Sequence, residues 1–324
     1  LSGAEKQQKL GFVRKQISNQ EDYLQDLYNL ISDGEHLKKY LKPDPKLKSN
    51  LEYLKRLTDK NRVKKNLDYF DMSLVLRFIQ IKNGGLPDGD GGTILLDHIV
   101  IDEAQDFGPV EFAIMMDAVR DKHQITIVGD VAQKILFARK FIGWKKVVEY
   151  LGLDEDSIIQ LEVSFRCTVP IMTLAYKVAG DPKTVVGRAG PAPEWKKVDN
   201  FVDLTEALAD WSRGLLRADP YKLVALICRY PKQAMELKEE MENYLPGEVR
   251  LGHRDQFSFE PGVLVTNIHQ VKGLEFDSVA LVEPDEENYP VKREESRNMI
   301  YVGITRTQED LLLATIRPYS SVLF

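Results

Sequence analysis

The sequence predicts an α/β fold built from parallel sheets. From Thr93 onward, short apolar runs alternate with amphipathic segments of helical spacing. The apolar runs contain few polar residues, which is typical of strands that are buried on both faces of a parallel sheet. At 324 residues, 43% hydrophobic and 29% charged, the chain has an ordinary globular composition and the length for two domains.

The N-terminal part, residues 1–90, is predicted to be mostly helical. Its helical stretches have few breakers, and prolines at Pro43 and Pro45 separate the first stretch from the second. Gly84 and Gly85 supply a stop signal for the last stretch, before a flexible turn. The expected helical stretches are residues 4–41, 51–57 and 68–83.

The remaining chain is predicted to form two domains, residues 91–150 and residues 151–324, with a boundary near residues 140–155. The loop Gly187–Trp195 lies inside the second domain. The expected strands are residues 93–102, 124–130, 157–163, 222–228, 262–267, 278–284 and 310–316. The expected helices are residues 109–119, 170–180, 231–245 and 293–307.

The charge is distributed unevenly. The net charge of −6 argues against nonspecific coating of nucleic acid, yet residues 1–83 hold 17 Lys and Arg against 11 Asp and Glu. Between Lys38 and Lys65 there are 11 basic and 3 acidic residues. This segment is either a face that neutralises phosphates or an ordinary solvated helical surface.

Membrane and secretory signals are absent from the sequence pattern. No window approaches the ~18 consecutive apolar residues of a membrane span, and the first residues do not resemble a signal peptide. Cys167 and Cys228 fit no metal or redox spacing and are expected to be buried, reduced thiols. A cytoplasmic protein is therefore expected.

Two adjacent carboxylates end the strand in "HIVIDEAQDF". Asp102 and Glu103 would point into a ligand crevice if that strand belongs to a parallel sheet. There Asp102 could hold Mg²⁺ and Glu103 could orient or deprotonate a water. The alternative is a helix N-terminus, where the dipole favours acidic residues. A second strand ends at Asp130, and Gln133 follows three residues later.

Taken together, five segments resemble the ordered motifs of the UvrD/Rep (PcrA-like) superfamily 1 DNA helicases. They occur in the family's order over residues 97–313, and the fourth in this chain is the most specific. The segments are "VIDEAQDF", "IVGDVAQKI", "LEVSFRCTVPI", "VTNIHQVKGLEFDSVALV" and "RNMIYVGITRTQEDLLL".

The resemblance implies two RecA-like (P-loop NTPase) parallel-sheet domains, with the first incomplete and carrying residues 1–90 as a helical insertion. It implies ATP and Mg²⁺ as cofactors, bound between the domains. It also implies movement along single-stranded DNA or at a duplex junction, 3′ to 5′, driven by ATP hydrolysis. The protein is expected to be a monomer.

The resemblance also assigns roles to residues at matching positions. Asp102 and Glu103 would be the Mg²⁺ ligand and the catalytic base, and both are assigned to the metal site. Gln133 would couple the γ-phosphate to domain closure. Arg166 and Arg306 would reach the γ-phosphate and stabilise the charge of the transition state.

Further residues would contact the nucleotide or the DNA. Glu275 would hydrogen-bond the nucleotide sugar, beside Gly273 in the nucleotide site, although the latter also fits a simple turn. Thr266 and His269 would lie toward the DNA strand. Tyr301 fits core packing as well as a functional role.

One family motif is missing. The run G-x-x-G-x-G-K-[ST], which cradles the β- and γ-phosphates, does not occur in the sequence. We expect the chain to be the C-terminal portion of a longer protein and to hydrolyse little or no ATP alone. The alternative is a degenerate, non-catalytic helicase module.

The length of one interval points to a second branch of the family. Only about 100 residues separate Arg166 from Thr266, too few for the large accessory domain of UvrD and Rep. This is more similar to HelD-like proteins, which bind RNA polymerase and help release it from nucleic acid. A HelD-like remodelling ATPase, with RNA polymerase as partner, is therefore an alternative function.

Overall fold

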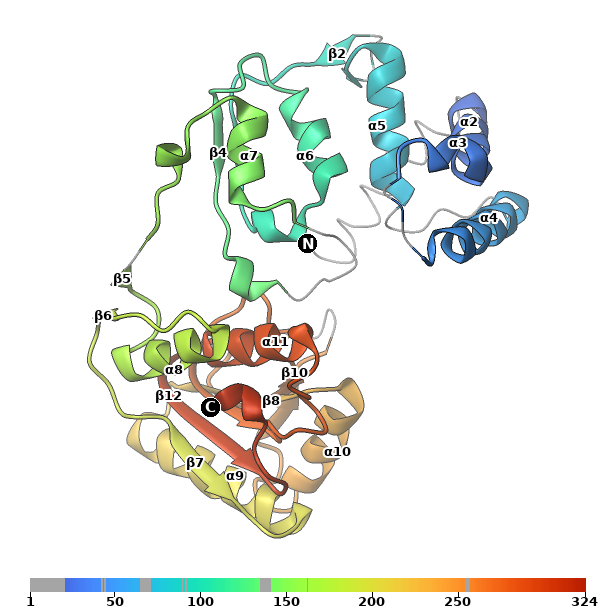
Figure 1. Cartoon of the computed structure of the whole chain (residues 1–324). Helices are drawn as coiled ribbons and strands as arrows, with labels where there is room; N and C mark the ends of the chain where they lie inside the picture. Colours follow the sequence, from blue (N-terminus) through green and yellow to red (C-terminus); the bar gives the residue numbers. More distant parts are fainter. Residues whose placement is uncertain are drawn as a thin grey trace. The chain divides into compact units, whose positions relative to one another are not determined.

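The computed structural model describes residues 21–41, 43, 45–64, 71–88, 90, 92–134, 141–161, 163–253 and 257–324. By their contacts these residues form two compact units (Figure 1). Unit 1 comprises residues 1–129 and 139–155, and unit 2 comprises residues 130–138 and 156–324.

Unit 1 begins with helices. Helix α2 packs against α4 and α5, around a small core of Leu27, Val75 and Ile79. Helix α5 ends at Asn83 and is followed by Gly84, whose φ of 72° is easily adopted only by glycine. The expected helices at residues 51–57 and 68–83 are confirmed within the described part. The helices are α2 Glu21–Ser32, α3 Gly34–Lys38, α4 Leu47–Lys64 and α5 Asp71–Asn83.

The first expected helix, residues 4–41, differs from the structure. It is interrupted at Asp33, whose side chain accepts the backbone N–H of His36 and caps α3. A short polar side chain that can cap a new helix competes with continuation of the old one. Residues 4–20 of this prediction lie outside the described residues.

The second part of unit 1 is a small α/β layer. Strand β3 (Ile99–Ile101) pairs in parallel with β4 (Ile125–Ile127), and helices α6 (Pro109–Met116) and α7 (Trp144–Leu151) cover one face. The expectation of a strand buried on both faces is wrong here, because Val100 on the other face is 67% exposed.

The expected strand 93–102 is divided in two. Its first part, β2 (Thr93–Ile94), turns away and pairs antiparallel with β1 (Leu86–Pro87). The Cβ of a residue replacing Gly85 would lie 2.8 Å from Cβ of Thr93, so this close pairing requires glycine.

Unit 2 is built on a six-stranded sheet with the order β7-β12-β11-β8-β10-β9. Every neighbouring pair is parallel. The strands are β7 Glu194–Lys197, β8 Leu223–Cys228, β9 Val249–Leu251, β10 Gly262–Asn267, β11 Phe276–Val282 and β12 Thr307–Thr315. The four long predicted strands of this unit are therefore confirmed.

Helices cover both faces of this sheet. Alternate residues of β8 point to opposite sides: Ala225 and Ile227 join the core beneath α8 and α11, and Val224 and Leu226 join the core beneath α9 and α10. Figure 1 shows the two helix pairs on the two sides of the sheet. The helices are α8 Val169–Ala179, α9 Phe201–Ala218, α10 Pro231–Met241 and α11 Glu294–Ile304.

Several elements differ from the sequence prediction. The strand expected at residues 157–163 is wrong, since only β5 (Val163–Ser164) forms there, paired with β6 (Val186–Gly187). The end of the expected loop Gly187–Trp195 already belongs to β7. Helices α7 and α9 were not predicted, although Asn200 caps α9 by accepting the N–H of Asp203.

Among the described residues, the structure contains no helix whose length and apolar character would suit it to cross a membrane.

Candidate nucleotide site

The carboxylates of Asp102 and Glu103 lie at the end of β3 in unit 1. Glu103 adopts a left-handed backbone with φ of 54°, and its N–H donates to Oδ1 of the exposed Asp102 over 2.8 Å. Glu103 also accepts a hydrogen bond from the buried amide of Gln105. A left-handed backbone at a non-glycine residue is strained, and such strain gathers at functional sites.

A glycine on the neighbouring strand end makes this turn possible. A Cβ at Gly129 would lie 2.6 Å from Oε1 of Gln105 and 3.0 Å from the backbone N of Ala104. The first distance would require Gln105 to move, and the second is tighter than most real Cβ contacts. Glycine at this position after β4 therefore lets the carboxylate turn pack closely against it.

The oxygen ligands of Asp102 and Glu103 fit a Mg²⁺ ion that is bound together with a nucleotide. Among the described residues no group of three or more His, Cys, Asp or Glu could hold a metal ion by itself. Mg²⁺ is usually held by one or two carboxylates together with waters and substrate phosphates. Asp102 and Glu103 supply such a pair of hard oxygen ligands, so they fit a metal that arrives with a nucleotide.

In unit 2, Gln133 lies in a polar cluster with α11. Asp130 caps the turn by accepting the N–H of Ala132 over 3.0 Å, and its other carboxylate oxygen accepts from Nε2 of Gln133 and from the hydroxyl of Tyr301, each over 3.0 Å. Burial, together with the charge of Asp130, raises the pKa of Tyr301, which keeps its hydroxyl protonated as the donor.

Arg306 completes this cluster. Its Nη2 donates to Oε1 of Gln133 over 2.6 Å, and the residue is only 1% exposed. Its Nε and Nη1 donate to the carbonyls of Val302 and Leu274, each over 3.2 Å. A buried guanidinium is costly unless it is hydrogen-bonded in this way, so the surrounding carbonyls hold it in one orientation.

The residues that follow Arg166 and precede Arg306 are in contact. The turns that carry them meet where Sγ of Cys167 lies 3.7 Å from the carbonyl of Thr305. Burial raises the pKa of the Cys167 thiol to about 11, although the nearby arginines oppose the shift, so the thiol stays protonated and can donate.

Glu275 is the ionic partner of Arg166. Nη2 of Arg166 lies 2.6 Å from its Oε1, and Nε2 of Gln308 donates to its Oε2 over 3.3 Å. Both members of the ion pair keep more than a third of their side chains exposed. Gly273, two residues earlier, has φ of 77°, which fits the turn that brings Glu275 to this place.

The two residues expected near DNA lie in different environments. Thr266 is fully buried, and its hydroxyl donates to the carbonyl of Gly252 over 2.8 Å. His269 is partly exposed, but its ring is partly buried where Nε2 lies 3.0 Å from Nη1 of Arg229. Burial and the Arg229 guanidinium lower the pKa of His269, so its Nε2 accepts from Arg229 as a neutral imidazole.

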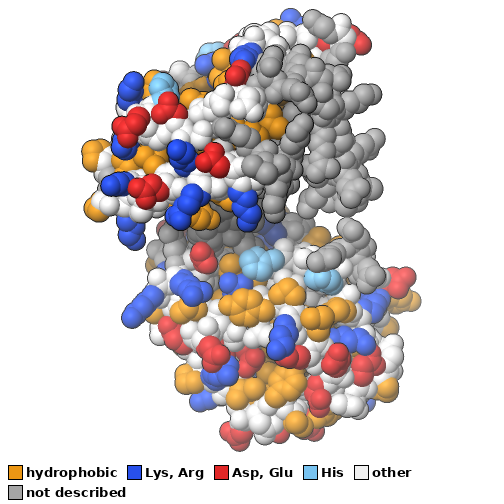
Figure 2. All heavy atoms as spheres, turned by 90° about the vertical axis from the view of Figure 1, so that its right-hand side faces the viewer, with side chains coloured by type: hydrophobic (Ala, Val, Ile, Leu, Met, Phe, Trp, Pro, Cys, Tyr) orange, Lys and Arg blue, Asp and Glu red, His pale blue; other side chains and the backbone are white. Residues whose placement is uncertain are grey.

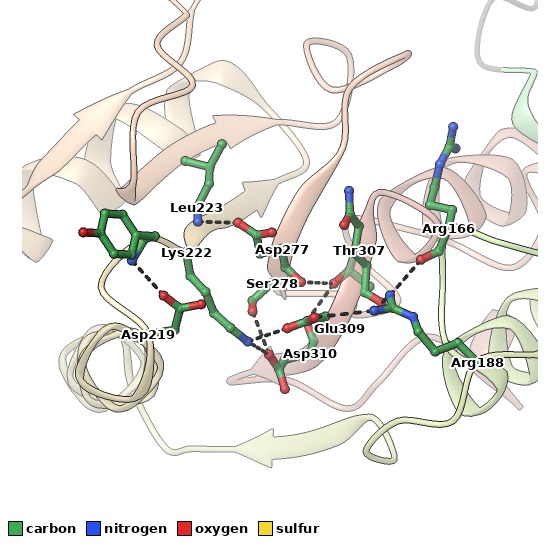
Figure 3. A network of polar contacts seen from close by, with 12 residues as sticks. Arg166, Arg188, Asp219, Lys222, Leu223, Asp277, Ser278, Thr307, Glu309 and Asp310 are labelled. Atoms are coloured by element: carbon green, nitrogen blue, oxygen red, sulfur yellow. Dashed lines mark hydrogen bonds and ion pairs between the residues drawn. The ribbon is translucent and has the colours of Figure 1, made fainter.

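The structure thus brings Gln133 together with Arg306, and Arg166 together with Glu275. Sequence reasoning missed the part played by Asp130, although its position at a strand end was a signal. It also missed Arg188, which bonds the carbonyl of Arg166 (Figure 3). No spacing rule connects Arg188 to the motifs.

Comparison with known proteins agrees with this architecture. Residues 4–139 match the family model of the UvrD/REP helicase N-terminal domain, and residues 222–318 match that of the UvrD-like helicase C-terminal domain. The two models together match more than two thirds of the chain, which confirms the family resemblance and the α/β, RecA-like fold class.

Solved structures and curated proteins add little. One similar structure is the C-terminal domain of a possible DNA helicase from Lactobacillus plantarum WCFS1, with 24% identity and a TM-score of 0.42, covering 50% of this chain and 92% of that chain. No curated protein matches the chain significantly.

Proposed function

Because the chain belongs to the UvrD/Rep-like superfamily 1 helicases, we propose that it forms part of an ATP-dependent DNA helicase that translocates on single-stranded DNA from 3′ to 5′. Residues 91–150 are assigned to the first RecA-like domain, residues 1–90 to its helical insertion and residues 151–324 to the second RecA-like domain. ATP and Mg²⁺ are the proposed cofactors, and single-stranded DNA or a duplex junction is the proposed partner.

The contact between Gln133 and Arg306 carries this proposal. Two residues that the family motifs assign to the γ-phosphate lie 173 positions apart in sequence, yet they are joined by a 2.6 Å hydrogen bond. The amide nitrogen of Gln133 also donates to Asp130 over 3.0 Å, so the carboxamide links Arg306 to the turn that Asp130 caps. A conformational change at Gln133 would therefore alter the hydrogen bonding of Arg306 directly.

The proposed chemistry follows from the type of each side chain. Mg²⁺, when bound with the nucleotide, neutralises phosphate charge. Glu103 accepts the proton of the attacking water, and Asp102 is the metal ligand. Arg166 and Arg306 stabilise the charge that develops on the transferred phosphoryl group, which planar guanidinium groups do well. Glu275, which already accepts from Gln308, can accept from a sugar hydroxyl when Arg166 turns to the phosphate.

The DNA contacts are proposed from charge and exposure. Figure 2 shows Lys and Arg interspersed with Asp and Glu over the described surface that it presents, so no single sign dominates that face. Helix α4 turns Leu51 inward and exposes more basic than acidic side chains, with Lys48, Lys55 and Arg56 among the exposed cations and Glu52 and Asp59 as the exposed acids. These three cations can follow a phosphate backbone.

ATP turnover in the presence and absence of single-stranded DNA tests the proposal. The intact protein, meaning the longer protein of which this chain is proposed to form part, should hydrolyse ATP. Single-stranded DNA should strongly stimulate this hydrolysis. Directional displacement of a duplex with a 3′ tail, but not a 5′ tail, is the expected polarity. Absence of any nucleotide binding by the intact protein would favour a non-catalytic module instead.

One observation favours a second candidate function, a HelD-like ATPase that remodels RNA polymerase. The chain between Arg166 and Thr266 contributes helices α8 to α10 and strands β6 to β9 to unit 2, and the described residues there form no separate accessory domain. Retention of purified core RNA polymerase by the intact protein, with no unwinding of a tailed duplex, would favour this candidate over the first.

A further inference from the structure

The segment from Val186 to Gly190, here called the Arg188 strap, lies along the turn that carries Arg166. Strand β6 pairs with β5 before the turn, in the register Ser164 to Gly187. After the turn, the N–H of Val169 donates to the carbonyl of Arg188 over 2.8 Å. Backbone hydrogen bonds therefore join the strap to the chain on both sides of Arg166.

Two glycines allow the strap to approach this closely. A Cβ at Gly187 would lie 2.8 Å from the carbonyl oxygen of Ser164, and a Cβ at Gly190 would lie 2.3 Å from Cγ2 of Thr168. Thr168 is itself buried. Any other residue at either position would push the strap away from the Arg166 turn.

The side chain of Arg188 adds a second connection. Its Nη2 donates to the carbonyl of Arg166 over 3.2 Å and to the carbonyl of Gln308 over 2.8 Å, while its Nη1 lies 3.5 Å from Oε1 of Glu309. Figure 3 shows this guanidinium between the Arg166 turn and the start of β12. One group thus ties the Arg166 turn to a point two residues beyond Arg306.

The start of β12 is a firm anchor. Lys222 at the start of β8 lies 2.9 Å from a carboxylate oxygen of Glu309 and 2.7 Å from one of Asp310, and it is largely buried. Asp310 also accepts from the hydroxyl of Ser278 on β11 over 2.8 Å. Three strands are therefore fixed to one another at the place where Arg188 attaches (Figure 3).

We infer that Arg188 is a positioning residue, which holds the backbone of Arg166 at a fixed distance from the Arg306 turn. The side chain of Arg166 forms an ion pair with Glu275 and is more than a third exposed, so it is free to turn. Its guanidinium can reach a phosphate at a defined position only when the backbone of Arg166 is held in place. The role of Arg188 in holding the backbone of Arg166 is inferred from the structure alone. The effect of Arg188 on phosphoryl transfer rests on the proposed function.

Hydrogen exchange tests the positional claim without any reference to catalysis. In the Arg188→Ala variant, the amides of Cys167 and Val169 should exchange about tenfold faster than in the unchanged protein, because a charge-assisted hydrogen bond that holds the turn is lost. Arg213→Ala is the matched control, since Arg213 also joins a carbonyl, of Tyr244, to a carboxylate, of Asp210. Unchanged exchange in Arg188→Ala would overturn the inference.

Kinetics of the intact protein test the consequence. Arg188→Ala should lower kcat for ATP by about 10- to 100-fold with little change in KM, since a misplacement near 1 Å costs about that much. If Arg188 acts through Arg166, then adding Arg188→Ala to Arg166→Ala should cause almost no further loss. Losses that multiply would show that Arg188 acts elsewhere and would overturn its positioning role.

The two tests separate the two proposals. Faster exchange in Arg188→Ala, in a protein that does not hydrolyse ATP at all, would support the strap and reject the proposed function. Gly190→Ala provides an independent variant, because its Cβ should displace the strap while leaving every charge in place. It should reproduce both effects of Arg188→Ala, and normal exchange and turnover in this variant would contradict the inference.

Discussion

Oε1 of Gln133 accepts a 2.6 Å hydrogen bond from Nη2 of Arg306, a nitrogen that also donates to the hydroxyl of the adjacent Thr305. The same glutamine donates to Asp130, which in turn accepts from Tyr301. A short segment after β4 is therefore joined to α11 through Tyr301, and also through Asn298, which donates to the carbonyl of Lys134, and to Arg306 just beyond the helix. Movement of this segment would change the environment of Arg306 directly.

Replacing Gln133 with alanine should release one side of Arg306. We expect kcat for ATP in the intact protein to fall by about 10²-fold, because the guanidinium is no longer held in one orientation. The midpoint of thermal unfolding should fall only slightly. Gln233→Ala is the control, since Gln233 also bonds a side chain, that of Asn288, but beyond the carboxyl ends of β8 and β11, whereas Arg306 precedes the amino end of β12. Equal losses in both variants would contradict a specific role for Gln133.

Removing the proposed catalytic groups should have a larger effect. Arg306→Ala in the intact protein should lower turnover by roughly 10³- to 10⁵-fold, the contribution of an arginine that stabilises phosphoryl-transfer charge. Because Arg306 is buried, its replacement can also destabilise the fold, so the midpoint of thermal unfolding of the variant must be measured in parallel. Arg306→Lys, which keeps the charge but not the planar fork, should remain strongly impaired. Near-normal turnover in Arg306→Lys would contradict the proposed role.

The carboxylate turn gives a second catalytic test. Glu103→Gln removes the proposed base but keeps the size of the side chain and its contact with Gln105. We expect turnover to fall by orders of magnitude while nucleotide binding persists, because a base acts in the chemical step rather than in binding. Single-turnover kinetics with a binding measurement would separate the two. Loss of binding with unchanged chemistry would point to a metal-holding role instead.

The sequence was sufficient for four of the six strands in the sheet of unit 2, while β7 and β9 were not predicted. Runs such as "KLVALIC" and "GVLVTN" are continuous and apolar because both faces of the sheet are covered, and such runs are easily recognised. Val100 in unit 1 shows where this reasoning fails. The run around it looks the same, but among the described residues its sheet has two strands and leaves Val100 exposed on one face, which no local pattern reveals.

The candidate site residues stay predictions, and the sequence named them singly rather than as a network. The motifs pointed to Gln133, Arg166 and Arg306 but gave no information about their burial or their partners. The strap residue Arg188 could not be predicted, because its importance depends on contacts with Arg166 and Gln308, 22 and 120 positions away. Long-range packing decides these contacts. In the sequence, glycines such as Gly190 indicate that another part of the chain approaches closely, but not which part.

This chain alone should hydrolyse little or no ATP. Its sequence contains no phosphate loop to hold the β- and γ-phosphates, so the groups described above would lack the main anchor of their substrate. Phosphate release should be close to background with and without single-stranded DNA. Strong turnover stimulated by single-stranded DNA would show that another element of the chain binds the phosphates.

The stability of the protein should depend on the state of His269. Burial and Arg229 lower its pKa in the folded protein, whereas the unfolded chain has a pKa near 6.5. The unfolded state therefore binds more protons as the pH falls below about 6.5, and folding stability decreases through that range. His269→Gln should unfold with a shallower pH dependence between pH 7 and 5 in denaturant titrations. An unchanged pH dependence would show that His269 is not responsible.

The exposed cations of α4 should set part of the salt dependence of DNA binding. Each cation that neutralises a phosphate on single-stranded DNA contributes about 0.7 to the slope of log K against log salt. Replacing Lys48, Lys55 and Arg56 with alanine should therefore reduce the magnitude of that slope by about 2 if all three contact the backbone. Fluorescence anisotropy with a labelled oligonucleotide, at several salt concentrations, measures it. A control triple variant of exposed lysines in unit 2, at Lys196, Lys197 and Lys232, makes a similar change in net charge. An equal reduction in both variants would show that net charge, rather than the α4 surface, governs binding.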